Sequence, residues 1–109
     1  MGKYVMDYDW LWTNEPHNDG SPATVLVSIS GDGAERAVRS WLQKLAAESG
    51  GITGSGGWVA KLREAAEDRV VLALISGGED VADGIYWATE EVGEVFARFE
   101  LEWENLPRI

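Results

Sequence analysis

The hydrophobic and polar positions of this chain follow two different periods. In residues 3–13, apolar and aromatic side chains occupy every second position, and Asp7 and Asp9 stand between them. Residues 94–104 repeat this alternation, which only Phe96 interrupts. A period of two is typical of a strand with one buried face, so both segments are predicted to be strands.

Two further segments have the composition of strands. Residues 23–30 read ATVLVSIS, and they are predicted to pair with residues 3–13 as a hairpin, across a loop of turn-forming residues at 14–22. Residues 69–76 read RVVLALIS, which is an almost continuous apolar run. Such a run predicts a strand that is covered on both faces and lies in the centre of its sheet.

The spacing of apolar residues becomes helical in the middle of the chain. A helix is predicted over residues 33–49, where Asp32 and Glu35 have the spacing of a capping box. Its apolar face is formed by Val38, Trp41, Leu42 and Leu45. A second, shorter helix is predicted from Trp58 to about Asp68, after the glycine-rich segment 50–57.

Residues 79–92 are compatible with either type of element. The segment 84–89 has strand composition, whereas Asp80 as a cap, followed by apolar residues at helical spacing, fits a helix. A helix would place Glu90 and Glu91 near its negative end, at a cost of about 0.3–1 kcal/mol each. The strand is therefore the preferred prediction.

These elements predict one α+β domain over residues 1–109. The expected architecture is an antiparallel sheet of about five strands with one or two helices packed on one face, in the order ββ(αα)βββ. A hydrophobic content of 45% with only three prolines favours a folded chain over a disordered one, despite the formal net charge of −10.

The negative charge is concentrated toward the C-terminal end. Residues 79–104 hold nine acids and one base, Arg98, which leaves a formal charge of −8, whereas residues 21–78 hold six acids and six bases. Such a field attracts basic partners and repels nucleic acid and anionic membranes. Adaptation to a salt-rich host is an alternative explanation, but it predicts acids over the whole surface.

The acids of the alternating segments are the candidate binding residues. In a strand, Glu100, Glu102 and Glu104 project from one face about 6.6–6.8 Å apart, and Asp7 and Asp9 can do the same on the first strand. This spacing is of the same order as that of phosphates along a nucleic-acid strand, so the face could occupy a site that normally holds DNA or RNA. A solvated face without a partner is the plain alternative.

Six tryptophans are the other prominent side chains. Their periodicity directs most of them into the core. Trp10, Trp12 and Trp103 lie at the ends of predicted strands, where a partly exposed aromatic side chain can anchor a protein interface.

The sequence contains little that supports catalysis or metal binding. It has no cysteine, and its one histidine, His17, lies in a predicted loop without a partner for a catalytic triad. The glycine-rich segment 50–57 lacks the ending of a phosphate-binding loop and is interpreted as a flexible connection. No catalytic residue, metal site or cofactor is predicted, and an enzyme of unrecognised type is a third alternative.

The N-terminus has no apolar signal core, and no run approaches the length of a membrane span, so a cytoplasmic protein that does not bind membranes is expected. In general character the chain resembles toxin-immunity proteins and phage-encoded antagonists of nucleic-acid-binding defence complexes, although it shares no motif with them.

The leading hypothesis is a non-enzymatic acidic inhibitor, either monomer or homodimer. It would occlude a basic protein partner, such as a nuclease or a nucleic-acid-guided complex, and would not bind nucleic acid directly. The alternative is a structural or small-ligand-binding subunit that associates through exposed aromatic residues.

Overall fold

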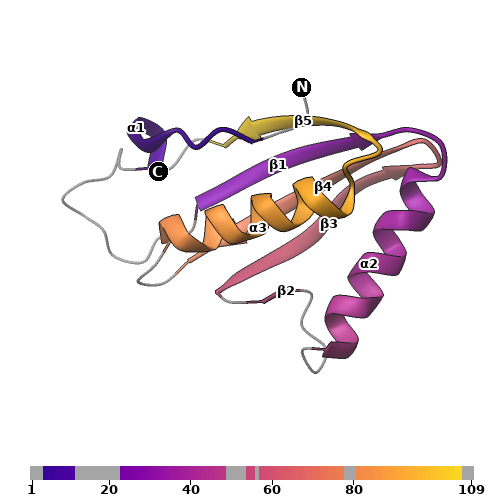
Figure 1. Cartoon of the computed structure of the whole chain (residues 1–109), viewed down its shortest axis with the longest axis horizontal. Helices are drawn as coiled ribbons and strands as arrows, with labels where there is room; N and C mark the ends of the chain where they lie inside the picture. The colour runs from indigo at the N-terminus through magenta and orange to yellow at the C-terminus, as the bar shows by residue number, and fades with distance from the viewer. Residues whose placement is uncertain (1–3, 12–22, 49–53, 56, 78–80, 107–109) are drawn as a thin grey trace.

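An antiparallel sheet with two long helices on one face forms the protein (Figure 1). The computed structural model describes residues 4–11, 23–48, 54–55, 57–77 and 81–106. In chain order, the elements are α1 (Tyr8–Leu11), β1 (Ala23–Ser30), α2 (Ala34–Glu48), β2 (Gly54–Ser55), β3 (Trp58–Ala66), β4 (Arg69–Ser76), α3 (Val81–Val95) and β5 (Glu100–Asn105).

The sheet has the strand order β2-β3-β4-β1-β5, and every neighbouring pair is antiparallel. Because β2 has only two residues, the four longer strands form nearly all of the sheet. The predicted α+β class is confirmed, but the predicted order ββ(αα)βββ is wrong, because α2 follows the first long strand and α3 precedes the last one. β4 is the central strand that its apolar sequence predicted, since it pairs with β3 on one edge and with β1 on the other.

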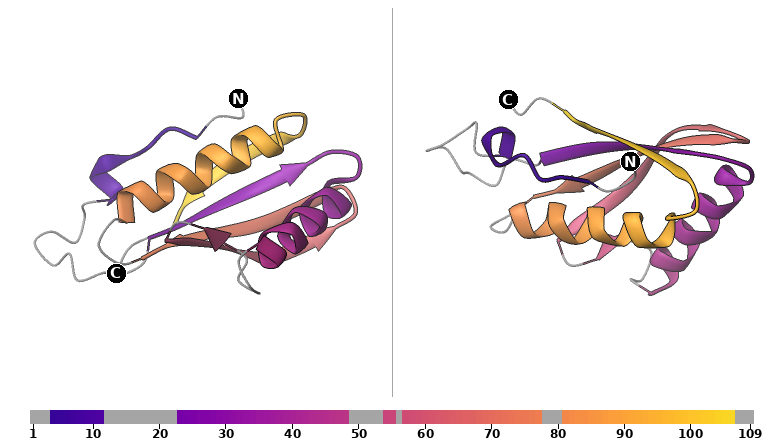
Figure 2. Two further views of the ribbon diagram at one scale, coloured as in Figure 1. Left: turned by 60° about the horizontal axis from the view of Figure 1, so that its bottom comes forward. Right: turned by 45° about the horizontal axis from the view of Figure 1, so that its top comes forward.

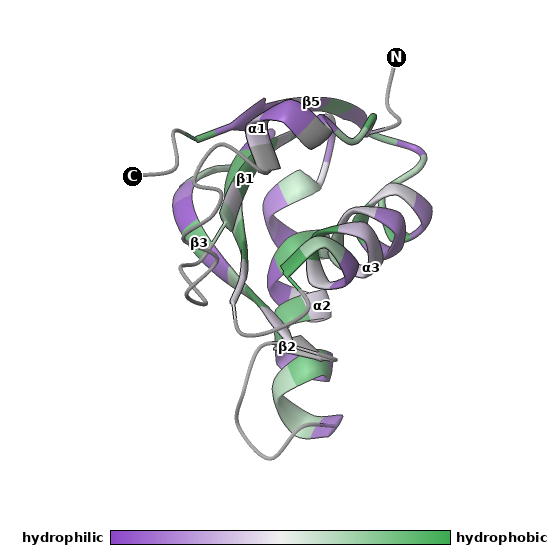
Figure 3. Cartoon of the chain, turned by 90° about the vertical axis from the view of Figure 1, so that its left-hand side faces the viewer, coloured by the Kyte–Doolittle hydropathy of each residue, from purple (hydrophilic) through white to green (hydrophobic). Residues whose placement is uncertain are grey.

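Both long helices cover the same face of the sheet, as Figure 3 shows from the end of the molecule. The side chains of β1 alternate between that face and the opposite one, so that Ala23, Val25, Val27 and Ile29 are fully buried. They meet the buried apolar side chains of the helices, which are Ala34, Val38, Trp41 and Leu45 on α2 and Val81, Ile85, Ala88 and Val92 on α3.

Helix α2 agrees with the predicted range of 33–49 to within one residue at each end. Its first turn is held differently from the predicted capping box. The N–H of Glu35 donates to the carbonyl of Glu67 in the β3–β4 turn, and the Glu35 carboxylate pairs with Arg39 at 3.0 Å. The helix start is thereby attached to the sheet.

The helix predicted from Trp58 to Asp68 is wrong, because this segment forms β3. Trp58 and Ala60 are buried toward the helices, and Lys61 is exposed on the other face. The strand pairs with β4 along its whole length, with a bulge around Arg63. Pairing with an apolar central strand satisfies the backbone of both strands, and this tertiary contact overrides the helical preference of alanine-rich residues.

The strand predicted at 79–92 is also wrong, because residues 81–95 form α3, which runs along the sheet (Figure 2). The dipole cost assigned to Glu90 and Glu91 is some tenths of a kcal/mol each. Full burial of a valine or isoleucine side chain contributes about 1.5–3 kcal/mol. The apolar face of α3 therefore outweighs the unfavourable charges at its C-terminal end.

The two terminal strands are the remaining differences. Within the described residues 4–11, residues 4–7 have no regular secondary structure and Tyr8–Leu11 form the short helix α1, so the strand predicted over 3–13 and its hairpin with 23–30 are wrong. The partners of β1 are β4 and β5 instead. The strand predicted over 94–104 exists only from Glu100 onward, because residues 94–99 complete α3 and the turn after it.

Candidate functional site

Three glutamates form a row on the face of the sheet that the helices leave open. Glu100, Glu102 and Glu104, hereafter the glutamate row, are exposed side chains of the edge strand β5. Their direct cross-strand neighbours on β1 are Ser30, Ser28 and Leu26, which share the open face. The alternation of the sequence therefore places these three carboxylates together, as the pattern predicted.

The open face also carries positive charge on the strands farther from β5. Lys61 of β3 lies on it, and a guanidinium nitrogen of Arg69 of β4 donates to Ser28 Oγ at 3.2 Å. Within the described part of the chain, no lysine or arginine forms an ion pair with the glutamate row. The face is thus acidic along one edge and contains bases across the sheet.

Asp7 and Asp9 do not extend the glutamate row. They belong to the N-terminal segment, which packs through Tyr4, Met6 and Trp10 on the helix-bearing side of the sheet. Asp7 has a local role as well, since its Oδ1 accepts a hydrogen bond from the N–H of Trp10 at 3.1 Å and so caps α1. These two aspartates were expected on a strand face and are found in a different layer.

The tryptophans chosen as anchors contribute to the fold. Trp10 is half-buried and donates from Nε1 to the carbonyl of Leu106 at 2.6 Å. Trp103 is half-buried, and its ring packs edge-on against Tyr4 with 5.3 Å between the ring centroids. Trp12 lies outside the described residues. Trp10 and Trp103 therefore attach the N-terminal segment to the end of β5.

The sequence interpretation missed the outward face of α3. Trp87 is 59% exposed and Tyr86 is 48% exposed, and their rings pack edge-to-face with centroids 5.1 Å apart. With the residues that share this face at helical spacing, they form a surface that we call the acid–aromatic stripe, made of Asp83, Tyr86, Trp87, Glu90 and Glu94. Residues 81–97 contain no lysine or arginine, so the stripe has no base of its own.

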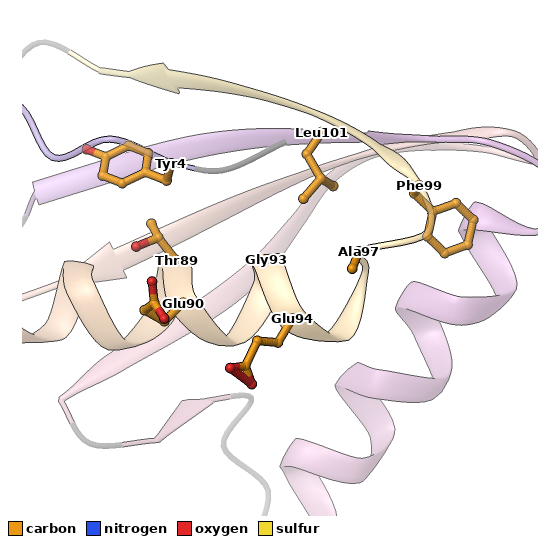
Figure 4. Close-up of a pocket in the computed structure, with 8 residues that line it drawn as sticks. All are labelled: Tyr4, Thr89, Glu90, Gly93, Glu94, Ala97, Phe99 and Leu101. Carbon is orange, nitrogen blue, oxygen red and sulfur yellow. The ribbon is translucent and has the colours of Figure 1, made fainter. Parts of the chain in front are cut away.

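A groove of about 360 Å³ lies beside the stripe, between α3 and β5 (Figure 4). Glu90 and Glu94 stand on the helix side of this α3–β5 groove, and apolar side chains such as Phe99 and Leu101 line the other side. Gly93 lines the groove without a side chain. The complete lining is Tyr4, Thr89, Glu90, Gly93, Glu94, Ala97, Phe99 and Leu101.

Two polar groups near the groove already have partners. The hydroxyl of Thr89 donates within the helix, with the carbonyl oxygens of Ile85 at 2.8 Å and Tyr86 at 3.1 Å. The hydroxyl of Tyr4 donates to Asn105 Oδ1 at 2.8 Å. Burial raises the pKa of Tyr4 above its ordinary value of 10.0, the bond to Asn105 lowers it, and the charge of Asp7 raises it further. The Tyr4 hydroxyl thus serves the fold as a neutral donor.

The described residues contain no group of three or more histidine, cysteine, aspartate or glutamate side chains arranged to hold a metal ion. Among them, no helix has the length and apolar character needed to cross a membrane. Comparisons of the chain with protein-family models, with curated proteins and with solved structures gave no match. The functional assignment therefore depends on the two acidic surfaces themselves.

Proposed function

We propose that this protein is a non-enzymatic acidic inhibitor, which binds a basic protein that acts on nucleic acid and covers the site where the nucleic acid would lie. The glutamate row is the observation that carries this proposal. Three exposed carboxylates follow one another on the open face of an edge strand, and no described lysine or arginine forms an ion pair with them. Such a row repels itself, and binding to a complementary basic surface would remove that repulsion.

The electrostatic attraction between this protein and a basic partner would act mainly on the rate of association. The formal net charge of −10 steers a basic partner toward the protein over distances beyond direct contact. At about 0.15 M ionic strength, screening shortens this range to about 8 Å. An interface of this kind is therefore expected to form quickly at low salt and to weaken steeply as salt is added.

Capture of partners from a nuclease-treated lysate, followed by a competition assay with each purified basic partner and a labelled nucleic acid, tests the proposal. The variant E100Q/E102Q/E104Q is expected to lose the partner and its competition with nucleic acid. The matched control E48Q/E64Q/E67Q changes the net charge by the same amount at exposed positions outside the row. Equal capture by the two variants, or binding unchanged between about 0.05 and 0.5 M salt, would overturn the proposal.

A further inference from the structure

We propose that the acid–aromatic stripe and the α3–β5 groove form a second docking surface, whose occupant is an arginine-bearing segment of a partner protein that also carries an apolar side chain. This surface shares no residue with the glutamate row. The inference therefore goes beyond the inhibitory function proposed above, and either can fail without the other.

The aromatic rings of Tyr86 and Trp87 are exposed on the outward face of α3. Their exposure is not required by the core, because α3 packs on the sheet through its other face, with Val81, Ile85 and Val92 nearly or fully buried. Tryptophan and tyrosine are enriched among the residues that contribute most to protein interfaces. Tyr86 and Trp87 hold each other edge-to-face, so little side-chain entropy would be lost when a partner covers them.

The acids of the stripe are placed unfavourably for the helix that carries them. Glu90 and Glu94 are one turn apart, and like charges at that spacing destabilise a helix by about 0.2–0.5 kcal/mol. Both also lie in the half of the helix where the dipole disfavours acids, and the last turn contains no base. A cationic partner would reverse both penalties. Glu91 differs from them, because it already accepts a hydrogen bond from Trp41.

The α3–β5 groove lies directly beside these charges. Tyr86, Glu90 and Gly93 follow one another at i, i+4 and i+7, so they lie along the flank of α3 that borders the groove. An apolar side chain can enter between Leu101 and Gly93 while a neighbouring cation reaches Glu90 or Glu94. A partner that offers only charge or only apolar surface would leave half of this surface unmatched.

Arginine fits this surface better than lysine. A guanidinium group can pair with a carboxylate through two parallel hydrogen bonds and can stack on an aromatic face, whereas an ammonium group acts as a point charge. Such a contact is present at Phe99, which lines the groove, where the Arg98 guanidinium lies 4.5 Å from the centroid of the Phe99 ring. Arg98 forms no ion pair with Glu90 or Glu94 within the described residues, so their charge stays available.

The length of α3 sets the length of the occupant. A helix of 15 residues extends over about 22 Å at 1.5 Å per residue. An extended segment of about seven residues covers that distance. A second copy of this chain is a poor occupant, because its own stripe carries the same charges and its formal net charge is also −10.

Selection from a displayed library of random linear peptides tests this inference with a defined probe. The selected sequences are expected to combine arginine with at least one apolar residue. Amide shifts of the labelled protein on adding such a peptide are expected to cluster at 83–97 and 99–101. Replacing the arginines of the peptide with lysine should weaken binding several-fold, because the paired hydrogen bonds are lost.

Variants of the protein complete the test. W87A is expected to weaken peptide binding about tenfold or more, and E90Q/E94Q to weaken it and reduce its salt dependence. The control E100Q/E102Q/E104Q keeps the stripe and should bind within about threefold of the unaltered protein, since it changes only longer-range steering. The inference is overturned by selection of peptides without arginine, by shifts centred on the glutamate row, by unchanged binding to W87A, or by a homodimer that W87A disrupts.

Discussion

The indole Nε1 of Trp41 donates a hydrogen bond to Glu91 Oε2 over 3.1 Å, and this contact joins α2 to α3. Trp41 is only 7% exposed, and its ring stacks on Trp58 and meets Phe96 edge-on. The half-buried Glu91 carboxylate of α3 therefore supports the core, because it accepts a hydrogen bond from an indole N–H that would otherwise lose its partner on burial. Its neighbours Glu90 and Glu94 have no such bond within the described residues.

Replacement of Glu91 should show that its carboxylate stabilises the fold, whereas replacement of Glu94 should not. E91A is expected to lower the free energy of unfolding by about 1–2 kcal/mol, because the indole N–H loses its acceptor. E91Q keeps an oxygen acceptor and should cost less. Urea denaturation followed by tryptophan fluorescence measures both values. E94A is the control, expected to stay within about 0.5 kcal/mol of the unaltered protein, and a loss as large as that of E91A would contradict this role for Glu91.

Replacing two glycines of α3 with alanine is expected to change the free energy of unfolding in opposite directions. An added methyl group at Gly84 would overlap the hydroxyl of Ser76, which is buried and donates to the carbonyl of Val81 at 2.9 Å. G84A should therefore destabilise the protein by about 1–3 kcal/mol through overpacking. At Gly93 nothing lies within 4 Å of an added Cβ, so G93A should stabilise the helix by about 0.5–1 kcal/mol. Thermal or chemical unfolding measures the stability of both variants. A change of the same sign in G84A and G93A would contradict this packing.

The tryptophans should divide into structural and exposed side chains. Trp58 is 4% exposed and packs on Trp41, so W58A is expected to cost about 3–5 kcal/mol through lost burial and the cavity that remains. W87A removes an exposed ring and should change stability by less than about 0.5 kcal/mol. In acrylamide quenching, W87F should remove most of the readily quenched emission of the described tryptophans. Comparable losses of stability in W58A and W87A would be inconsistent with a buried Trp58 and an exposed Trp87.

The Tyr4 hydroxyl should make stability depend on alkaline pH. Its pKa is raised in the folded protein, mainly by burial, so the folded state holds the phenolic proton more tightly than the unfolded chain. The stability from this group is complete below the unfolded pKa of about 10. It is lost as the pH rises from there through the higher pKa of the folded state.

Denaturation of the unaltered protein and of Y4F between about pH 8 and pH 11 measures this effect. Y4F should be less stable at pH 8, because the bond to Asn105 is missing, and its stability should fall less as the pH rises. Parallel pH profiles of the two proteins would show that Tyr4 does not contribute to the alkaline dependence.

The elements that the sequence predicted well are those whose local pattern agrees with their tertiary environment. β1 and β4 have the predicted bounds, and α2 matches within one residue at each end. In β1 and α2, the positions that face the core recur with the period of the element itself. β4 was recognisable as a central strand because it is apolar on both faces. The glutamate row was predicted for the same reason, since strict alternation in β5 leaves its acids on one face.

The sequence by itself thus determined the α+β class, the central strand and one row of carboxylates. Tertiary packing decided the rest. The segment 58–66 became a strand because β4 needed a partner along its free edge, and 81–95 became a helix because burial of its apolar face outweighs a small dipole cost. In a strand, Tyr86, Glu90 and Glu94 would lie on the face opposite to Asp83 and Trp87. Only the helical turn brings these five side chains onto one surface.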